Sequence, residues 1–434
     1  MPTLTRRQTL TALGISAIAA PTAGALTAQS ATAAEGDQRH RVVLIDIDGF
    51  DPRLLDGAYA DIHPLPRIRQ LRREGAWGVA SGTFASYSNS SRTSTATGTW
   101  PAVHRNTGYY LTAEGATVTQ ERYIEPGVET IAHALRRQNR TGAYVQWYAV
   151  QNYGASYGDP QQLYTQPGGT ISDRVDDAVA LLSGEPVFSG GQQVTVPQVP
   201  DFLAVYSSEV DGYLHSNGFA RAGLADALEE TDTQVGRLLD TITDLGLADT
   251  TTVILTSDHG LREWTQPLLP ELQSVLESTG ASVSYVSAGG TADPEAEIVV
   301  YCAPRTADIT VRAAFGRGEL TRLARRIERI HGVAKVYDER ELGRMGASDK
   351  HGDLVVEPIE PFHFSTLQDG VRRASHGGLE EAEVPLIIAG AGVRRGSRLR
   401  RPSLLDIAPT ICQILDVGPP SSAHGRHLRE AFLR

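Results

Sequence analysis

The chain alternates short apolar runs with stretches of helical periodicity, and this alternation limits its possible folds more than any other feature. The apolar runs predict strands at residues 41–45, 143–148, 202–206 and 251–256. The clearest predicted helix carries six apolar residues on one face: Leu224, Leu228, Val235, Leu238, Ile242 and Leu245. Because strands and helices alternate along the chain, we expect an α/β fold with a mostly parallel central sheet.

Two of the predicted strands are followed by residues of metal-ligand type. Residues 256–260 read Thr-Ser-Asp-His-Gly, so Asp258 and His259 come directly after one strand, and Asp48 comes after the strand at 41–45. A divalent ion such as zinc accepts both a carboxylate oxygen and an imidazole nitrogen. The alternative for Asp-His-Gly is an ordinary turn, because Asp and Gly both favour turn backbones.

Two further segments offer ligands of the same types. Asp211 and His215 follow the strand at 202–206, and their spacing brings both side chains to one side of a helical turn. Such pairs are common on exposed helix faces, so this pair alone is a weak indication. His376 lies in a Ser-His-Gly-Gly stretch that we expect to be a loop. The three Asp and three His residues together match the ligand inventory of a two-metal phosphoryl-transfer site.

A candidate nucleophile lies in residues 81–99, which are rich in serine and threonine. The stretch could be a polar linker, but Gly98 and Pro101 are typical of a helix end and predict a short helix that begins after Ser88. Backbone N–H groups at a helix start are suited to bind phosphate oxygens. A hydroxyl group placed there needs no neighbouring base if a metal ion lowers its pKa.

Residues 1–34 are predicted to be an export leader that is removed. Arg6 and Arg7 precede a weakly apolar stretch and a small-residue cleavage site, which is typical of a twin-arginine signal; an ordinary secretory leader is the alternative. Pro21 interrupts the stretch, so we expect an exported protein without a permanent membrane span. The formal net charge of −11 becomes −13 without the two arginines, which disfavours binding to nucleic-acid polymers but permits a small phosphorylated substrate.

The pattern becomes irregular at residues 261–350, and we expect this region to be an inserted cap within a catalytic domain at 40–434. Export would permit a disulfide between Cys302 and Cys412, although two buried free thiols agree equally well with the apolar residues around them. Asp46 has no clear role. It could support a ligand, point away from Asp48, or pair with an arginine.

Read in order, these motifs resemble the alkaline phosphatase superfamily, most closely its nucleotide pyrophosphatase/phosphodiesterase branch. The matching elements are Asp-Gly-Phe at 48–50, Thr-Gly-x-x-Pro-x-x-His at 97–104, Asp-x-x-x-His at 211–215, residues 256–260 and His-Gly at 376–377. Residues 405–410 and 425–428 resemble the C-terminal helix and tail of the superfamily. The resemblance implies a three-layer sandwich, with helices on both faces of the sheet.

The resemblance also implies roles for the candidate residues. Asp211, His215 and His376 would hold one divalent ion, and Asp48, Asp258 and His259 would hold the other, with zinc as the expected metal. The nucleophile of the superfamily lies nine positions before the Thr of the Thr-Gly step, which is Ser88 here. It would attack phosphorus in a phosphodiester or nucleotide pyrophosphate and form a phosphoseryl intermediate.

The chain also departs from the family pattern. Ser88-Asn89-Ser90-Ser91 stands where the family usually has Thr-Phe-Pro-Asn, and Leu214 replaces a Gly. Ser91 takes the place of a phosphate-contacting Asn, with Asn89 or Arg92 as possible substitutes.

Three other functions stay open. Arg92 could bind a phosphate monoester dianion, which would make the protein an alkaline phosphomonoesterase. Ser88 and Arg92 also resemble part of a sulfatase loop, although sulfatases use calcium, which suits this His-rich ligand set less well. The last alternative is a metal-binding protein without catalytic activity. An aromatic wall of Tyr87, Trp100, Tyr109 and Tyr110 would favour a diester.

Overall fold

The computed structural model describes residues 39–312, 315–367 and 370–433, so the predicted leader at 1–34 lies outside the described residues. Its central element is a seven-stranded sheet with the order β2-β20-β10-β1-β9-β5-β6. The strands are β1 (Arg41–Ile47), β2 (Ala76–Ser81), β5 (Gly142–Val145), β6 (Gln162–Thr165), β9 (Phe202–Ser207), β10 (Thr251–Thr256) and β20 (Glu383–Gly390). Strands β10, β1, β9, β5 and β6 are parallel, whereas β20 is antiparallel to both β10 and β2. The expected α/β fold with a mostly parallel sheet is confirmed.

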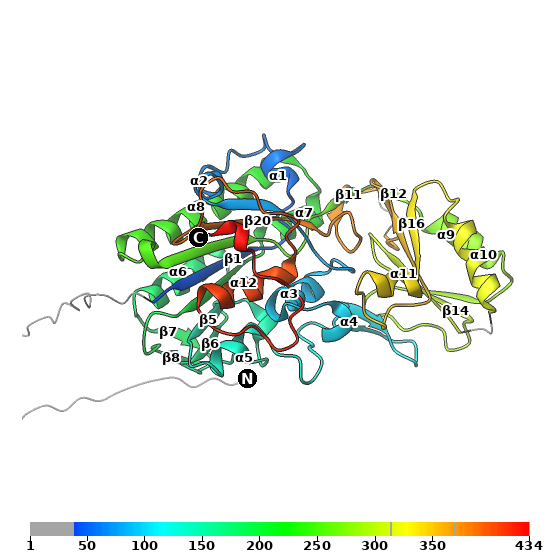
Figure 1. Ribbon diagram of the computed structural model, residues 1–434. Coiled ribbons are helices and arrows are strands. Elements are labelled where there is room, and N and C mark those ends of the chain that lie inside the picture. Colours follow the sequence, from blue (N-terminus) through cyan, green and yellow to red (C-terminus); the bar gives the residue numbers. More distant parts are fainter. Residues whose placement is uncertain (1–38, 313–314, 368–369, 434) are drawn as a thin grey trace, which may run out of the picture. The chain divides into compact units, whose positions relative to one another are not determined.

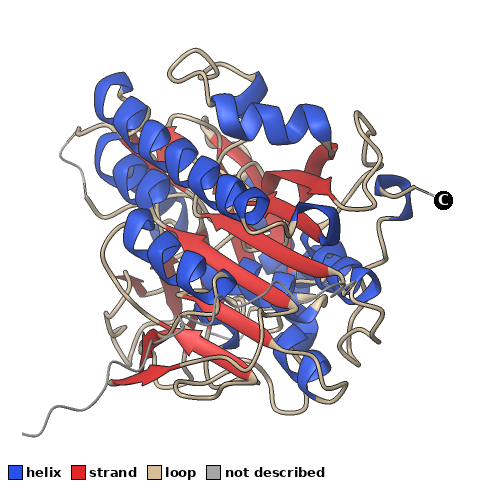
Figure 2. Cartoon of the chain, turned by 90° about the vertical axis from the view of Figure 1, so that its left-hand side faces the viewer, coloured by secondary structure: helices blue, strands red, loops and turns tan. Residues whose placement is uncertain are grey.

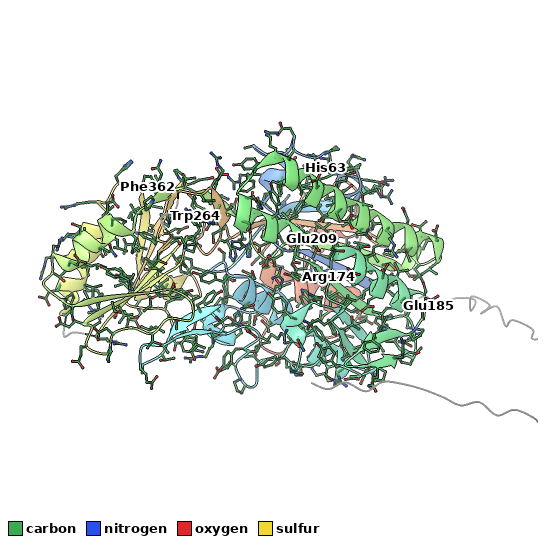
Figure 3. The ribbon with its side chains drawn as sticks, turned by 180° about the vertical axis from the view of Figure 1, so that it is seen from behind. His63, Arg174, Glu185, Glu209, Trp264 and Phe362 are labelled. Carbon is green, nitrogen blue, oxygen red and sulfur yellow. The ribbon has the colours of Figure 1, made fainter. Side chains whose placement is uncertain are left out.

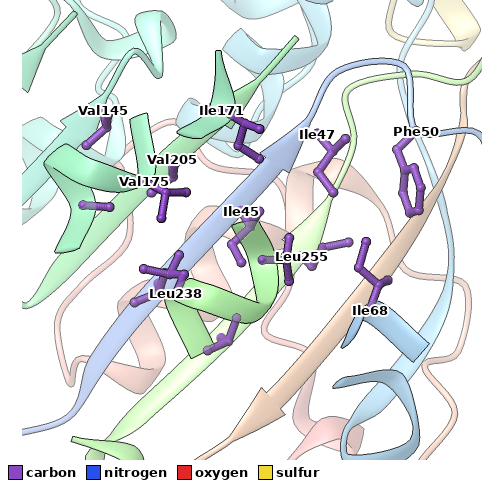
Figure 4. Close-up of a cluster of buried hydrophobic side chains, with 14 of the residues drawn as sticks. Ile45, Ile47, Phe50, Ile68, Val145, Ile171, Val175, Val205, Leu238 and Leu255 are labelled. Atoms are coloured by element: carbon purple, nitrogen blue, oxygen red, sulfur yellow. The ribbon is translucent and has the colours of Figure 1, made fainter. Parts of the chain in front are cut away.

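Strand β1 is buried on both faces because helices cover both sides of the sheet. Val43, Ile45 and Ile47 pack into one hydrophobic cluster, and Val42 and Leu44 pack into the other. Figure 4 shows the first cluster, with Ile45 and Ile47 of β1 beside Leu255 of β10. This alternation explains why the strand reads as a continuous apolar run.

Each cluster is completed by its own set of helices (Figures 1 and 2). Helices α2 (Pro66–Glu74), α6 (Ile171–Leu182) and α8 (Arg221–Asp244) contribute to the first cluster. Helices α3 (Ser88–Thr97), α5 (Ile131–Arg136) and α12 (Ile407–Ile414) contribute to the second. The three-layer arrangement therefore agrees with the expectation.

A second sheet of five strands has the order β13-β14-β15-β17-β16. Its strands are β13 (Val283–Val286), β14 (Ile298–Cys302), β15 (Ala307–Val311), β16 (Val333–Asp338) and β17 (Leu354–Pro358), with helices α9 (Leu269–Glu277), α10 (Arg317–Ile327) and α11 (Glu339–Arg344). It has its own hydrophobic cluster. Because β17 belongs to this sheet, the second sheet extends beyond residue 350, the expected end of the insertion. The role expected for residues 261–350, to shape the substrate site, remains a prediction.

The chain leaves the first sheet and returns to it along neighbouring paths. Strand β11 (Arg262–Trp264) pairs with β19 (Arg373–Ser375), and β12 (Gln266–Pro267) pairs with β18 (Phe362–His363). Figure 3 shows Trp264 and Phe362 close together at this crossing. The remaining elements are α1 (Arg53–Asp56), α4 (Pro101–His104), α7 (Glu209–Asn217), the hairpins β3 (Tyr109–Leu111) with β4 (Thr117–Thr119) and β7 (Val187–Ser189) with β8 (Gln192–Val194), and four 3-10 turns: η1 (Tyr148–Val150), η2 (Ala248–Thr250), η3 (Leu404–Asp406) and η4 (Arg429–Ala431).

Most predicted elements are present, with shifted ends. The strand expected at 143–148 ends at Val145, because Gln146 adopts a positive φ of 53°. Cys302 and Cys412 are buried free thiols, so of the two alternatives the structure has the free thiols and not the disulfide. Within the described part of the chain, no helix combines the length and hydrophobicity needed to cross a bilayer.

Replacing Leu255 by Ala should test the packing of the central sheet. The Leu255 side chain is fully buried between β1 and the helices of the first cluster, so its loss should lower the free energy of unfolding by about 2–5 kcal/mol. The matched control is Val79→Ala on β2, where the side chain is 44% exposed and the change should stay within about 0.5 kcal/mol. Urea denaturation measures the free energy of unfolding of both variants. Equal decreases in the two variants would contradict the assigned core.

Candidate active site

The sheet brings three ligand-bearing segments to one edge. In the register of β1 with its two neighbours, Asp46 lies opposite Thr256 of β10 and Tyr206 of β9. The segments that follow these strands therefore emerge side by side, at the carboxyl ends where open α/β sheets bind ligands.

Asp48, Asp258 and His259 form a buried group in which the ligand atoms lie within 4.8 Å of one another. One oxygen of each carboxylate is held by a hydrogen bond: the Tyr206 hydroxyl donates to Asp48 Oδ2 at 2.7 Å, and the Gly49 N–H donates to Asp258 Oδ1 at 3.3 Å. The other oxygens, Asp48 Oδ1 and Asp258 Oδ2, accept no hydrogen bond and have only ionic contacts. Buried carboxylate oxygens that accept no hydrogen bond fit a cation.

The two buried histidines are oriented in the same way. His259 Nδ1 lies 3.0 Å from the carbonyl oxygen of Gly260, and His376 Nδ1 lies 2.8 Å from that of Ser86. A carbonyl oxygen accepts only, so Nδ1 carries the hydrogen in both rings. When the rings are neutral, each Nε2 therefore has a free lone pair for a metal ion.

Asp211, His215 and His376 form a second group with ligand atoms within the same 4.8 Å limit. Helix α7 presents Asp211 and His215 one turn apart, with His215 Nε2 3.3 Å from Asp211 Oδ1. Asp211 Oδ1 accepts no hydrogen bond. Burial, together with the nearby His259 and His215, holds the pKa of His376 well below its usual value, so this imidazole is neutral and able to bind a cation.

Arg92 lies beneath the first group and contacts three carboxylates. Its guanidinium is fully buried, with Nε 2.9 Å from Asp46 Oδ2, Nη2 3.2 Å from Asp48 Oδ2 and Nη1 2.9 Å from Asp258 Oδ2. Asp46 also accepts a hydrogen bond from Trp147 Nε1 at 2.8 Å, so pairing with an arginine is the role that the structure gives to Asp46. Arg92 was expected to contact substrate. Its guanidinium is instead paired with these three carboxylates.

Ser88 is the first residue of α3 and lies between the two groups of ligands. Its Oγ is 2.9 Å from His259 Nε2 of the first group, and it lines one cavity with Asp211, His215 and His376 of the second. Asn89 lines the same cavity. Ser91 was expected to contact substrate, but its side chain is fully buried inside α3 and does not line the cavity.

The cavity has a volume of about 660 Å³ and an aromatic wall. Tyr87 and Tyr109 line it, as expected, whereas Trp100 and Tyr110 do not. The sequence did not indicate Tyr148 or Tyr301, which complete the wall. The Tyr109 and Tyr301 rings stack with centroids 5.7 Å apart, which brings the second sheet into the cavity through β14.

Ser86 connects the Ser88 segment to the His376 loop, and no motif in the sequence marks it for this role. Its Oγ donates to the Gly378 carbonyl at 2.7 Å and accepts from the Gly377 N–H at 3.0 Å. Its N–H donates to the Gly377 carbonyl at 3.2 Å, and its own carbonyl accepts from His376. One buried serine thus connects the start of the Ser88 segment to the His376 loop.

The opposite side of the same loop is held from the second sheet. Glu381 Oε2 accepts from the Gly378 N–H at 2.8 Å, and its Oε1 lies 2.7 Å from Arg305 Nε. Arg305 follows β14 and is fully buried, as is Glu381. Only the fold brings these residues together, and no motif in the sequence marks them.

Comparison with known proteins identifies the family of this chain. The model of the family "Type I phosphodiesterase / nucleotide pyrophosphatase" matches residues 42–375. The chain is 22% identical over 402 residues to a mouse bis(5'-adenosyl)-triphosphatase, enpp4, covering 87% of this chain and 78% of that protein. It is 25% identical over 289 residues to a protein of Myroides odoratus named calcium-transporting ATPase, and spans about half the length of that relative (51%).

Solved structures share the fold. Murine ectonucleotide pyrophosphatase / phosphodiesterase 5 superposes with a TM-score of 0.66 at 15% identity, covering 87% of this chain and 96% of that one. The human protein of the same name gives the same TM-score, identity and coverage. The family match spans most of the chain, including the β1 end, α3, α7 and the segment after β10. The chain therefore belongs to the type I phosphodiesterase/nucleotide pyrophosphatase family of hydrolases, within the alkaline phosphatase superfamily.

Proposed function

We propose that this protein hydrolyses phosphodiester or nucleotide pyrophosphate bonds through a covalent intermediate on Ser88. One observation carries the proposal: Ser88 begins a helix that faces the cavity, touches His259 of one ligand group and shares the cavity with the other. A hydroxyl between two ligand groups is where an attacking oxygen is required for in-line transfer.

Two divalent ions, zinc by the same proposal, fit the residues. Asp46, Asp48 and Asp258 surround one guanidinium, so the buried carboxylates exceed the buried positive charge of Arg92 when His259 is neutral. Each group supplies three ligands with mixed oxygen and nitrogen donors, which suits tetrahedral zinc with one open position. When bound, the ions would supply charge stabilisation to the attacking and leaving oxygens.

The residues of the chain account for the remaining chemistry. Ser88 Oγ releases its proton to solvent and forms a bond to phosphorus, while the bond from phosphorus to the leaving oxygen breaks and that oxygen takes up a proton from solvent. The N–H groups at the start of α3 face the bound phosphoryl oxygens. Water then cleaves the Ser88 phosphoester from the opposite side, which restores the hydroxyl and releases the phosphorylated product.

The aromatic wall supports a substrate with a second substituent on phosphorus. Tyr109 and Tyr301 offer stacked rings at the cavity, and a mouse relative is named as an enzyme that acts on a bis-adenosyl triphosphate. The phosphomonoesterase alternative depended on an Arg92 that reaches substrate, and its guanidinium lies among carboxylates instead. Export through a leader at residues 1–34, with Arg6 and Arg7 as the signal, is part of the same proposal.

Ser88→Ala should lower turnover of a thymidine nitrophenyl phosphodiester by orders of magnitude while zinc content is retained. A positioned attacking atom can contribute roughly 7–11 kcal/mol to lowering a barrier, and a bound water would restore part of that loss. The matched control is Ser90→Ala, which removes one buried hydrogen bond to the Asn106 carbonyl. This change should raise the activation free energy by only about 0.5–1.5 kcal/mol. Near-normal turnover by the Ser88 variant, or acid-trapped phosphate on another serine, would contradict the assignment.

Zinc affinity should rise with pH up to about 9. Burial alone would lower the pKa of His259, but the Asp258, Asp48 and Asp211 carboxylates together outweigh it and raise the pKa to about 9 in the metal-free protein. The raised pKa means that protonated His259 stabilises the metal-free fold fully below pH 6.5 and loses this effect as pH passes 9. A cation must displace that proton, so affinity should increase by up to about tenfold per pH unit below 9. Chelator competition at pH 6.5, 7.5 and 8.5 measures the zinc affinity. An affinity that does not change with pH would contradict the protonation of His259.

Ser86→Ala should weaken zinc binding at the second group without unfolding the protein. The change leaves the Gly377 N–H and the Gly378 carbonyl without their buried partner, at a cost of about 1–3 kcal/mol, and loosens the His376 loop. Zinc stoichiometry and chelator competition give the measurement, with Ser90→Ala as the control of equal burial. Unchanged affinity in the Ser86 variant would show that the loop is held without this hydroxyl.

A further inference from the structure

A second cavity, of about 590 Å³, lies on a part of the chain that the proposed chemistry does not use. Four arginines line it together with Ser397 and Phe432: Arg394, Arg398, Arg400 and Arg429, which we call the arginine cradle. The cradle shares no residue with the catalytic cavity. Its first segment follows β20, whose Gly390 pairs with Thr252 at the start of β10, whereas Asp258 follows the end of β10.

The cradle carries more positive charge than its surroundings compensate. Glu430 is the acid that lines it, and both its oxygens already accept from Arg426, at 2.9 and 3.0 Å. These hydrogen bonds lower the pKa of Glu430 to about 2, so it stays ionised and paired with Arg426. Within the part of the chain that the structure describes, Arg394, Arg400 and Arg429 pair with no carboxylate. This concentration of charge occurs in a chain whose formal net charge is −11.

The backbone that carries these arginines is fixed by hydrogen bonds. The Arg394 N–H donates to the Ala431 carbonyl at 2.8 Å, and the Arg400 N–H donates to Glu430 Oε1 at 3.1 Å. Ser397 Oγ donates to the Glu430 carbonyl at 2.8 Å, and Val393 pairs with Phe432 in an antiparallel bridge. The two segments of the cradle are therefore held together before any ligand arrives, which lowers the entropic cost of binding.

One guanidinium is also fixed directly. Arg398 lies over the Trp77 ring at 3.3 Å from its centroid, and Arg72 lies 3.4 Å from the same centroid. Two guanidinium groups this close to one centroid must occupy opposite faces of the ring. The ring thus orients Arg398 by cation–π attraction without neutralising its charge.

We propose that the arginine cradle binds a soluble anion carrying several phosphate groups, such as an oligophosphate chain. Guanidinium groups match phosphate oxygens in a bidentate manner, and four of them around one cavity repel one another until an anion compensates them. Several linked phosphates can reach several arginines at once in a cavity of this volume. The inference does not depend on the proposed catalytic function.

Calorimetric titration of the full, metal-depleted protein with tripolyphosphate tests the cradle. Arg400→Gln combined with Arg429→Gln should weaken binding roughly tenfold or more, because each lost charge-assisted hydrogen bond weakens affinity substantially. The matched control is Arg322→Gln combined with Arg340→Gln, which removes the same charge from exposed arginines of the second-sheet region and should leave affinity unchanged. Both double variants keep the catalytic cavity intact, so tripolyphosphate bound there would be unaffected.

The remaining arms identify the source of the phosphate. Orthophosphate should bind at least tenfold more weakly than tripolyphosphate, because it reaches fewer arginines. Equal affinity of the wild type and the Arg400/Arg429 variant for tripolyphosphate would overturn the proposal. Binding to phosphatidylglycerol vesicles without binding to tripolyphosphate would also overturn it, since the ligand would then be a lipid surface.

Discussion

The structure of the site depends on the burial of three carboxylates around one guanidinium. Asp46, Asp48 and Asp258 lie beside Arg92, and all four side chains are withdrawn from water. Buried charges of this kind are stable only as a set, because removing one partner of such a pair typically costs about 3–5 kcal/mol. Burial raises the pKa of Asp48 well above its usual value, and the neighbouring Asp258 and Asp211 carboxylates add to this shift. Arg92 therefore fixes where Asp48 and Asp258 lie, and the excess of negative charge suits a cation at this group.

Much of this arrangement could be predicted because its signals are local. Strands β1, β9 and β10 are read from apolar runs, and their ligands follow within a few residues. The spacing of Asp211 and His215 lies within one helical turn. The roles of Arg92 and Ser91 could not be predicted in the same way, because both depend on which face of α3 meets the sheet. Helix α3 is uniformly polar and is buried on all sides from Ser90 to Thr97, so periodicity gives no indication of which side chains face the sheet.

Contacts between distant segments explain the rest. Ser86, Arg305 and Glu381 come from three separate regions, and only the fold brings them to the His376 loop. Tyr301 reaches the cavity from β14, in the region expected to be an irregular cap. The second sheet thus contributes to holding a ligand loop, as well as to the cavity wall. A region that looks separable in sequence is tied to the ligand loop through two buried charges.

Strand β2 has a consequence for how the chain acquires its fold. It pairs along its length with β20, and Ala76 of the early strand meets Ile388 near the end of the chain. The backbone groups of β2 cannot form their hydrogen bonds to β20 until almost the whole polypeptide has been synthesised. Long-range pairing of this kind slows folding, since the loop between the partners must be closed first. Until that moment Trp77 and its neighbours form an open strand edge, so the nascent chain is most exposed to misassociation in the interval before β20 is made.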